Sequence, residues 1–284
     1  MTSTTLGHQT STTLGQRVPV ALTIAGSDSG GGAGIQADLR TFSFHQVHGT
    51  SALTCVTAQN TLGVMRVDAL APEAVIAQIE AVTVDIGVQA AKTGMLLNRA
   101  IIEAVASYLA AQPIEQLVVD PVMVSRTGAR LIDEGAIAAL TTQLLPLAAV
   151  LTPNRHEAQI LADMPIETLA DMQSAAKKIR ALGPRAVVVK GGGFDNALQG
   201  VDVWFDGERL ETLKTELVET PNTHGTGCTL SSAIAANLAK GKSPLEAVSA
   251  AKHYVTQALK HSLSIGQGQG PVGHFYPLMP SITP

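Results

Sequence analysis

Residues 20–34 read VALTIAGSDSGGGAG, and Ala33 to His45 have the spacing of an amphipathic helix. The first six of these residues form a short apolar run, which is typical of a buried strand. The glycines that follow allow a tight turn and a close approach of the backbone to a ligand. A strand that enters a helix through such a turn is the first half of a βαβ unit. This stretch therefore predicts an α/β fold with a mostly parallel central sheet.

Apolar runs and helical patterns alternate along the rest of the chain, as in successive βαβ units. We expect further strands at Ser51–Ala58, Val64–Leu70, Ala90–Thr93, Leu117–Asp120, Val150–Thr152 and Ala186–Lys190. Helices are expected at Pro72–Thr83, Arg99–Ala111, Ile132–Leu144, Arg155–Ala162, Leu169–Leu182, Gly227–Ala239 and Pro244–His261. The runs Gly200–Phe205 and Leu210–Leu217 flank Asp206-Gly207 and predict a hairpin. No linker interrupts this pattern, so a single domain is expected over residues 18–284.

The composition excludes several classes of protein. The chain has 284 residues, 45% of them hydrophobic, and a mean hydropathy of +0.22, so it can bury a sizeable core. A net charge of −4 and a pI near 6.0 give no electrostatic footprint for nucleic acid or for an anionic membrane. No apolar run approaches the roughly 20 residues of a membrane span. We expect neither nucleic acid nor a membrane as a partner.

The N-terminus and the cysteines bear on the compartment. Residues 1–17 are rich in Ser, Thr, Gly and Gln and lack the charged and apolar regions of a secretory signal, so a disordered tail is expected there. Cys55 and Cys228 are the only cysteines, and Cys55 lies in an apolar strand pattern. A disulfide framework is therefore not expected, and the cytoplasm is the predicted location. The eight histidines show no metal-ligand spacing.

The segment Thr223–Thr229 reads THGTGCT and precedes the apolar helical run Leu230 to Leu238. Its two glycines, Gly225 and Gly227, allow the backbone N–H groups at the helix start to converge. Those groups, with roughly half a positive charge from the helix dipole, suit a phosphate. The same field lowers a thiol pKa from about 8.5, so Cys228 is expected to be partly thiolate at neutral pH. The alternative is a glycine turn before a packed helix with a small buried cysteine.

Polar residues follow the first two predicted strands. Asp38 falls one turn inside the first helix, where its carboxylate either caps loop N–H groups or accepts hydrogen bonds from a ligand. Gln59 ends the second strand, and its amide matches a ring nitrogen beside an exocyclic amine. The alternative for Gln59 is an ordinary turn residue. In open parallel sheets ligands bind beyond the carboxyl ends of the strands, so these residues are expected at one site.

Charged residues end the later strands. Asp120 is expected at the end of one strand, and Lys190 at the end of another, just before three glycines. Lys190 in this position either binds the phosphates of a nucleotide or is simply exposed to solvent. Asn154 and Glu157 have the spacing of a capping box, which needs no ligand. Glu157 is equally suited to help hold Mg²⁺, directly or through water, because Mg²⁺ prefers oxygen ligands and retains several waters.

Taken in order, these motifs closely resemble the hydroxymethylpyrimidine/phosphomethylpyrimidine kinases of thiamine biosynthesis. The matching segments are Ala25–Asp38, Ala58–Thr61, Lys92–Leu96, Asp120–Met123, Thr152–Asn154 with Glu157, Lys190–Gly192, Thr223–Thr229, and Gly268–Val272 with His274-Phe275. The resemblance spans Val20 to Phe275; the loop Ser27–Gly32 varies and the N-terminal tail has no match. It implies the ribokinase-like fold, a three-layer αβα arrangement with helices on both faces of the sheet.

The resemblance also implies an activity, namely transfer of the ATP γ-phosphoryl group to the pyrimidine's hydroxymethyl group and then to the resulting monophosphate, with Mg²⁺ as cofactor and a homodimer as assembly. The implied catalytic residues are Cys228 and the anion-hole residues Gly225, Thr226 and Gly227. The implied pyrimidine-binding residues are Gln59, Asp38, Gly26 and Met95. Lys190, Asn154 and Thr223 fall at the nucleotide, and Asp120 and Glu157 at the metal.

Two alternatives stay open at this stage. A pyridoxal kinase is one, because a cysteine-bearing branch of the superfamily resembles this chain and pyridoxal is also a hydroxymethyl heteroaromatic. Gln59 together with Met95 favours the aminopyrimidine. The other is a non-catalytic pyrimidine-binding regulator on the same fold, against which the intact Asp120, Glu157 and Lys190 argue.

Overall fold

The computed structural model describes residues 18–123 and 132–279. The predicted disordered tail at residues 1–17 lies outside this part of the chain. The strands are β1 (Val20–Asp28), β2 (His48–Asn60), β3 (Gly63–Ala69), β4 (Ala90–Thr93), β5 (Leu117–Val119), β6 (Val150–Leu151), β7 (Val187–Val189), β8 (Val201–Phe205) and β9 (Leu210–Lys214). The α-helices are α1 (Gly34–Phe44), α2 (Pro72–Asp85), α3 (Arg99–Ala111), α4 (Glu134–Ala139), α5 (Arg155–Ala162), α6 (Leu169–Arg180), α7 (Thr226–Ala239) and α8 (Pro244–Lys260).

All the described strands belong to one nine-stranded sheet in the order β3-β2-β1-β4-β5-β6-β7-β8-β9. Neighbours from β2 to β7 pair in parallel, while β3, β8 and β9 add antiparallel ladders at the two edges. The expected mostly parallel sheet and the hairpin at β8–β9 are confirmed. The chain passes from β1 to β2 on one side and later to β4 on the other, so the strand order reverses between β1 and β4. Such a reversal opens a crevice at the carboxyl ends of these strands.

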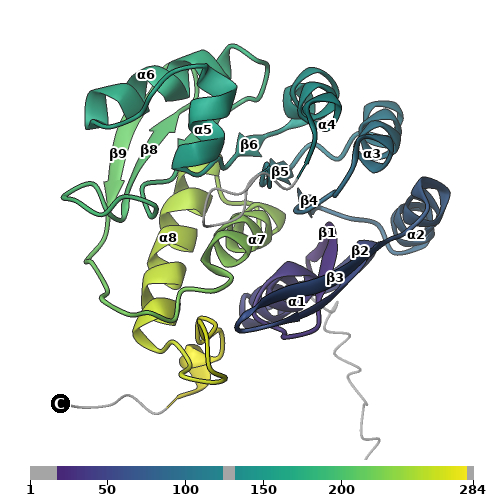
Figure 1. Ribbon diagram of the computed structural model, residues 1–284. Coiled ribbons are helices and arrows are strands. Elements are labelled where there is room, and N and C mark those ends of the chain that lie inside the picture. The colour runs from purple at the N-terminus through teal and green to yellow at the C-terminus, as the bar shows by residue number, and fades with distance from the viewer. Residues whose placement is uncertain (1–17, 124–131, 280–284) are drawn as a thin grey trace, which may run out of the picture.

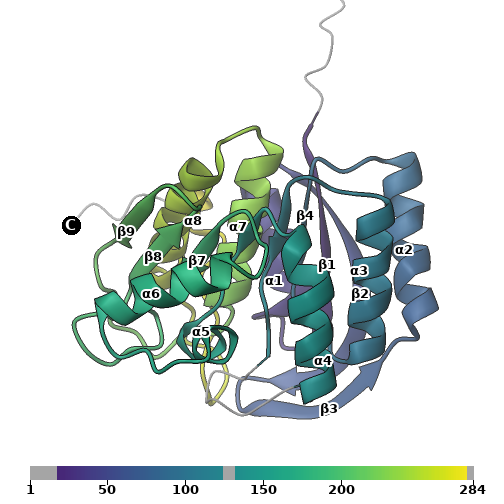
Figure 2. The same cartoon turned by 90° about the horizontal axis from the view of Figure 1, so that it is seen from above.

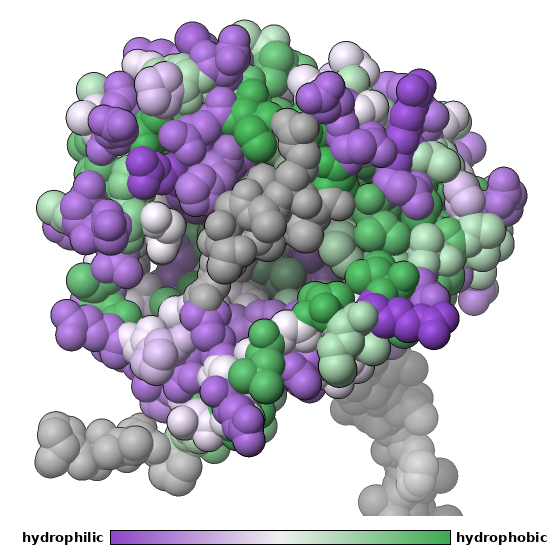
Figure 3. Space-filling model, viewed as in Figure 1, coloured by the Kyte–Doolittle hydropathy of each residue, from purple (hydrophilic) through white to green (hydrophobic). Residues whose placement is uncertain are grey.

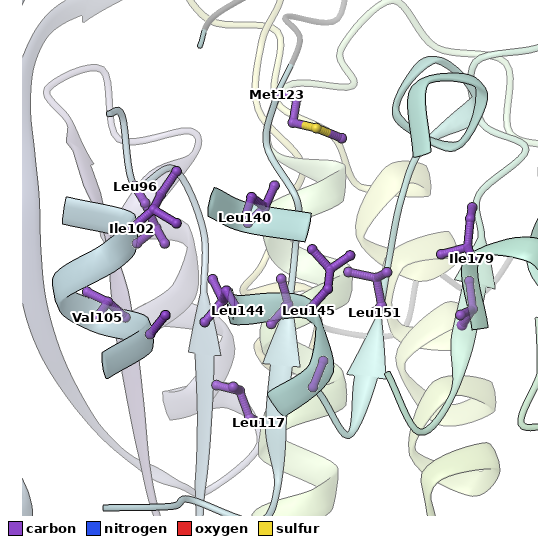
Figure 4. Close-up of a cluster of buried hydrophobic side chains, with 14 of the residues drawn as sticks. Leu96, Ile102, Val105, Leu117, Met123, Leu140, Leu144, Leu145, Leu151 and Ile179 are labelled. Atoms are coloured by element: carbon purple, nitrogen blue, oxygen red, sulfur yellow. The ribbon is translucent and has the colours of Figure 1, made fainter. Parts of the chain in front are cut away.

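Helices cover both faces of the sheet, as the ribokinase-like prediction requires (Figures 1 and 2). Helices α1, α7 and α8 enclose one buried cluster, which contains Phe42, Ile234 and Val248. Helices α2 to α6 cover the other face over a larger cluster, part of which Figure 4 shows around Leu117, Leu144 and Leu151. Because β5, β6 and β7 are buried on both sides, their sequences are continuous apolar runs rather than alternating ones.

The helix predicted at Ile132–Leu144 differs from the observed structure. An α-helical segment covers only Glu134–Ala139, and Leu140–Leu144 continues as a π-helical turn before a short 3₁₀ turn at Leu145–Leu147. Pro146 lacks an amide hydrogen, so it cannot continue the α-helical ladder. The Leu145 N–H donates instead to the Leu140 carbonyl, five residues back.

The surface, the helix lengths and the cysteines bear on the expectations drawn from the composition. Hydrophobic residues form small groups among hydrophilic ones on the face in Figure 3. Within the described residues, no helix combines the length and the apolar character needed to cross a lipid bilayer. Cys55 and Cys228 are both free thiols, as expected.

Candidate active site

The charged residues predicted at the strand ends meet in the structure. Lys190 Nζ lies 3.0 Å from Asp120 Oδ1, although 70 residues separate them in the chain. Lys190 also pairs with Asn154 through an isolated parallel bridge just beyond β6 and β7. Burial lowers the pKa of Lys190, but the carboxylates of Asp120 and Glu157 outweigh it and hold that pKa above its usual value. The lysine is therefore a fixed positive charge at this edge of the sheet.

The segment Thr223–Thr229 forms the anion loop of the prediction, at the start of α7. Gly225 is the N-cap with φ of 83°, a left-handed conformation that favours glycine. The Thr229 N–H donates to the Gly225 carbonyl, and Thr226 Oγ1 donates to the Thr223 carbonyl. The N–H groups of the first helical turn have no partner four residues earlier within a helix, which makes a helix start a site for an anion.

The anion loop lies directly against the charged pair. A Cβ added at Gly227 would lie 3.6 Å from Lys190 Nζ and 3.7 Å from Asp120 Oδ2. A Cβ added at Gly225 would lie only 1.9 Å from the Gly32 carbonyl oxygen of the β1–α1 loop. The two glycine-rich loops thus touch backbone to backbone, and the helix start, the lysine and the aspartate converge on one point.

Two polar residues that contact Asp120 were not among the predicted site residues. Ser231 Oγ lies 3.3 Å from Asp120 Oδ2, and Thr152 Oγ1 lies 3.3 Å from Asp120 Oδ1. Both side chains are buried, so their hydroxyl groups are committed to protein partners. Thr152 follows directly after β6, and Asp120 follows directly after β5; because Val119 pairs with Leu151, the two residues lie side by side. This position just after a parallel strand is the sequence signal for Thr152. Ser231 lies on a helix face that only tertiary packing turns toward Asp120.

Asn154 and Glu157 form the capping box that their spacing predicts. Asn154 Oδ1 accepts from the Glu157 N–H at 3.0 Å, and Glu157 Oε2 accepts from the Asn154 N–H at 2.8 Å. Glu157 is nevertheless more than a cap. Burial raises its pKa to about 8; Lys190 opposes this shift, while Asp120 adds to it. In the protein alone this carboxyl group holds a proton more readily than an exposed glutamate does.

The carboxyl groups of Asp120 and Glu157 are suited to bind a magnesium ion. Among the described residues no group of three His, Cys, Asp or Glu side chains gathers in a metal-binding arrangement. Mg²⁺ commonly uses only one or two protein carboxylates and keeps waters and substrate phosphates as its other ligands. Burial and the neighbouring Asp120 together raise the pKa of Glu157, and a divalent cation beside them would favour its ionised form. The residues present therefore suit the predicted cofactor, while its binding stays a prediction.

Cys228 does not have the lowered pKa that the helix start predicts. Burial raises the pKa of its thiol to about 11, and the nearby carboxylates of Asp38 and Asp120 add to the shift. The Lys92 ammonium and the Gly34 N–H oppose this shift without reversing it. The expectation of a partly ionised thiolate at neutral pH is wrong, because burial and two carboxylates outweigh the helix dipole.

Asp38 is enclosed by protein groups. Its side chain is fully buried, and its oxygens accept from Lys92 Nζ at 2.9 and 3.0 Å, from Thr23 Oγ1 at 2.6 Å and from Ser232 Oγ at 2.6 Å. The reading that Asp38 caps loop N–H groups is wrong, because Asp28 does so. Contact between Asp38 and a pyrimidine stays a prediction; in the structure it joins β1, β4 and α7.

Asp28 organises the β1–α1 loop and was not among the predicted residues. Its carboxylate accepts from the N–H groups of Gly30, Gly32 and Ala33 at 2.8 to 3.0 Å. His224 Nε2 of the anion loop lies 2.9 Å from Asp28 Oδ2. Burial raises the pKa of Asp28, but hydrogen bonds from His224 and the backbone bring it below its usual value. Asp28 and His224 therefore tie the two glycine-rich loops together by side chains as well.

The residues predicted for the pyrimidine border the same region. A Cβ added at Gly26 would lie 2.9 Å from Met95 Cε, so Gly26 and Met95 are neighbours. Gln59 Nε2 lies 3.4 Å from His224 Nε2 and thus faces the anion loop. The structure thus places Gln59 against the anion loop, and it places Gly26 of β1 beside Met95, which follows β4. Their contact with a ligand stays a prediction.

Comparison with known proteins agrees with this geometry. The family described as phosphomethylpyrimidine kinase matches residues 28–273. This chain belongs to the phosphomethylpyrimidine kinase family. Among its relatives is the hydroxymethylpyrimidine/phosphomethylpyrimidine kinase of Synechococcus elongatus, 66% identical over 261 residues, which cover 92% of this chain and 99% of that protein.

Solved structures of this family and its neighbours share the fold. The phosphomethylpyrimidine kinase of Clostridium difficile is 42% identical, with a TM-score of 0.77 over 85% of this chain and 99% of that one. An ADP complex of Bacillus subtilis pyridoxal kinase is 43% identical, with a TM-score of 0.87 over 93% of this chain and 100% of that one. The ribokinase-like αβα prediction is thereby confirmed. Both a phosphomethylpyrimidine kinase and a pyridoxal kinase thus closely resemble this member of the family.

Proposed function

We propose that this chain catalyses ATP-dependent phosphorylation of 4-amino-5-hydroxymethyl-2-methylpyrimidine, first to the monophosphate and then to the diphosphate, in thiamine biosynthesis. One observation carries the proposal: the start of α7 meets the Lys190–Asp120 pair, with Gly227 beside both side chains. A helix start and a lysine stabilise the charge that develops on a transferring phosphoryl group. The 66% identity to the Synechococcus kinase supports this choice of substrate.

In the proposed reaction the chain acts mainly by positioning. The backbone N–H groups of Gly225 to Cys228 would hold the transferring group, and Lys190, with Asn154 and Thr223, would contact the nucleotide. Asp120 and Glu157 would hold Mg²⁺, which neutralises phosphate charge when bound. Because the thiol of Cys228 has a pKa of about 11, it would orient the substrate hydroxyl as a neutral hydrogen-bonding group rather than exist as a free thiolate.

The assembly and location complete the proposal. We place the enzyme in the cytoplasm as a homodimer. The edge strand β3 supports the dimer, because all of its residues are exposed and Val64, Met65 and Val67 are apolar. An exposed apolar edge strand is a surface that proteins commonly cover.

A pyridoxal kinase is the second candidate. The similarity to the Bacillus subtilis pyridoxal kinase favours it, at a TM-score of 0.87. Gln59 at the crevice argues for the aminopyrimidine, because an amide offers a donor and an acceptor side by side, and the pyrimidine's amine and ring nitrogen match that pair.

One experiment tests both candidates. Purified full-length protein is incubated with Mg-ATP and either hydroxymethylpyrimidine or pyridoxal, and the mono- and diphosphate products are resolved over time. We expect both pyrimidine phosphates in sequence, with a higher kcat/KM for the pyrimidine than for pyridoxal. A clear preference for pyridoxal would reverse the assignment. Tight pyrimidine binding without ATP turnover would instead indicate a regulator.

A further inference from the structure

The contacts of His224 fix the position of its proton. Its Nε2 lies 2.9 Å from Asp28 Oδ2, and the same carboxylate accepts three backbone N–H groups. Hydrogen bonds hold the pKa of Asp28 below its usual value despite burial, so Asp28 is an anion at neutral pH. An anion can only accept, and two acceptors do not approach to 2.9 Å without a proton between them. His224 Nε2 therefore carries a hydrogen and donates to Asp28.

This proton decides which end of the Gln59 amide faces His224. The contact at 3.4 Å joins Gln59 Nε2 to His224 Nε2, which would set two donors against each other. At the other end Gln59 Oε1 lies 3.3 Å from Thr57 Oγ1, whose own hydrogen is already donated to the Ser27 carbonyl at 2.8 Å. That arrangement sets two acceptors against each other.

Turning the amide by 180° corrects both contacts at once. Gln59 Oε1 then becomes a second and more distant acceptor for the single hydrogen on His224 Nε2, which it shares with Asp28 in a three-centre hydrogen bond. Gln59 Nε2 donates to Thr57 Oγ1, while the positions of the atoms barely change. The two ends of an amide have almost the same shape, so hydrogen-bond partners decide its orientation. The result is one continuous chain of donors and acceptors from Asp28 through His224, Gln59 and Thr57 to the Ser27 carbonyl.

We propose that His224 is a positioning residue that selects the orientation of the Gln59 amide and thereby the direction in which the pyrimidine ring binds. His224 occupies one lone pair of the Gln59 amide oxygen, and Thr57 occupies one N–H of the amide nitrogen. Gln59 can therefore offer a ligand the other lone pair, on the anion-loop side, and the other N–H, on the Thr57 side. A ring that binds this edge places its exocyclic amine toward the anion loop and its ring nitrogen toward Thr57.

The consequence for the substrate follows from its structure. In the aminopyrimidine the hydroxymethyl group is attached next to the carbon that bears the amine. An amine directed toward the anion loop therefore directs the hydroxymethyl group there too, beside the start of α7. The opposite amide orientation would turn the ring over and carry the hydroxyl away. This inference rests on the proposed function and on the proposed contact of Gln59 with the pyrimidine.

The test compares two alcohols in the wild-type protein and in three variants. We measure kcat and KM for 4-amino-5-hydroxymethyl-2-methylpyrimidine and for the analogue without the 4-amino group. His224→Leu removes the donor, and we expect the preference for the amino compound to fall about tenfold, through KM, with the KM for ATP unchanged. His224→Gln retains an N–H at a similar reach and should recover most of that preference. Thr57→Val, which removes the partner at the other end of the amide, should also lower it.

A double-mutant cycle and a control separate positioning from structural damage. In a Gln59→Ala background, His224→Leu should have little further effect on the preference, because the amide that it orients is gone. His253, exposed on α8, provides the matched change His253→Leu, which should alter neither KM. An unchanged preference in His224→Leu, or an equal loss with and without Gln59, would overturn the proposal.

The proposed function can fail separately from this inference. The preference between the two pyrimidines is also measured by equilibrium binding without ATP. If the wild-type protein binds the pyrimidine but transfers no phosphate, the kinase assignment fails while the binding data still decide the role of His224. If the wild-type protein binds both pyrimidines equally, the inference about His224 is wrong even where phosphorylation proceeds.

Discussion

At the scale of single residues, burial governs the chemistry of this site more than local sequence does. Cys228 stands at a helix start, yet its thiol pKa is about 11 because of burial and nearby carboxylates. Glu157 stands in a capping box, yet burial raises its pKa to about 8. Neither shift follows from the neighbours of these residues in the chain.

Cys228→Ala should slow the first phosphoryl transfer more than the second. The first acceptor is an alcohol that must be oriented and must lose its proton, whereas the second is an already ionised phosphate. We expect a loss of about tenfold or more in the first step, at the lower end of what general acid–base groups contribute, and a smaller loss in the second.

Single-turnover assays that start from hydroxymethylpyrimidine or from its monophosphate measure the two steps separately. Cys228→Ser, which keeps a small hydrogen-bonding group, should retain more of the first step than Cys228→Ala. Equal slowing of both steps by Cys228→Ala would contradict the role given to the thiol.

At the scale of elements, close contacts between loops build the site. The anion loop touches the β1–α1 loop at Gly225 and Gly32, and residues 270–272 pair with His224 through backbone hydrogen bonds. His274 adds a side-chain contact, with Nε2 2.9 Å from Thr229 Oγ1 in the first turn of α7. Segments from both ends of the chain therefore position one helix start.

Gly225→Ala should be far more damaging than Gly241→Ala, although both glycines flank α7 and have nearly the same φ, 83° and 84°. An alanine in this left-handed conformation lowers the free energy of unfolding by about 1 kcal/mol at either position. Only Gly225 also meets backbone, at 1.9 Å, whereas Gly241 has nothing within 4 Å. We expect at least about 2 kcal/mol of additional destabilisation at Gly225 and a lower kcat.

Urea unfolding of both variants, with steady-state kinetics beside it, measures this difference. Because Gly241→Ala carries the same backbone strain, subtracting its effect isolates the contact between the two loops. Similar stability losses in the two variants would show that the loops do not approach each other as closely as the structure has them.

His274 should make the protein less stable in mild acid. Burial, and to a lesser extent the charge of Arg40, lowers the pKa of His274 from 6.5 to about 4. Between these two pKa values the unfolded chain binds a proton that the folded protein excludes. The contribution of His274 to the free energy of unfolding is therefore fully present above about pH 6.5, and it is lost as the pH falls toward about 4. From His274 alone we expect the free energy of unfolding to fall by about 2 kcal/mol between pH 7 and pH 5.

His274→Gln retains an N–H for Thr229 but does not titrate, so its stability should depend less on pH. The measurement is chemical denaturation at pH 7 and pH 5 for the wild type, for His274→Gln and for the exposed control His253→Gln. The proposed cause is wrong if His274→Gln loses as much stability in acid as the wild type does.

At the scale of the whole molecule, the nine-stranded sheet runs from an exposed apolar edge at β3 to the hairpin β8–β9. We propose that residues 18–284 form one domain around it, because helices from along the described chain pack on this one sheet. The remaining apolar surface of the edge is then available to a second copy.

Met65→Glu should convert the proposed dimer into a monomer. Met65 is 73% exposed on β3, and a carboxylate buried without a partner in an interface is costly. Light scattering after size-exclusion chromatography measures the mass. Val84, 83% exposed on α2, supplies the control Val84→Glu, which should remain dimeric. A monomeric wild type at micromolar concentration, or a Met65→Glu variant that stays dimeric, would contradict the β3 interface.

Much of the fold was predictable from sequence because local patterns determine elements. The apolar runs of β5 and β7, the glycine turn after β1 and the Asn154–Glu157 cap each specify a local structure without distant partners. Strand-end reasoning also predicted that Asp120 and Lys190 would meet, since parallel strands share a carboxyl edge.

The sequence by itself therefore determined the order of the elements, the type of most of them, and the family. Only the tertiary structure decided which groups face one another: Asp28 rather than Asp38 holds the loop, Ser231 turns to Asp120, and His224 reaches Gln59 across 165 residues. It also decided the charge of Cys228. The physical reason is that dielectric environment and hydrogen-bond partners are properties of packing between distant segments, which no local pattern encodes.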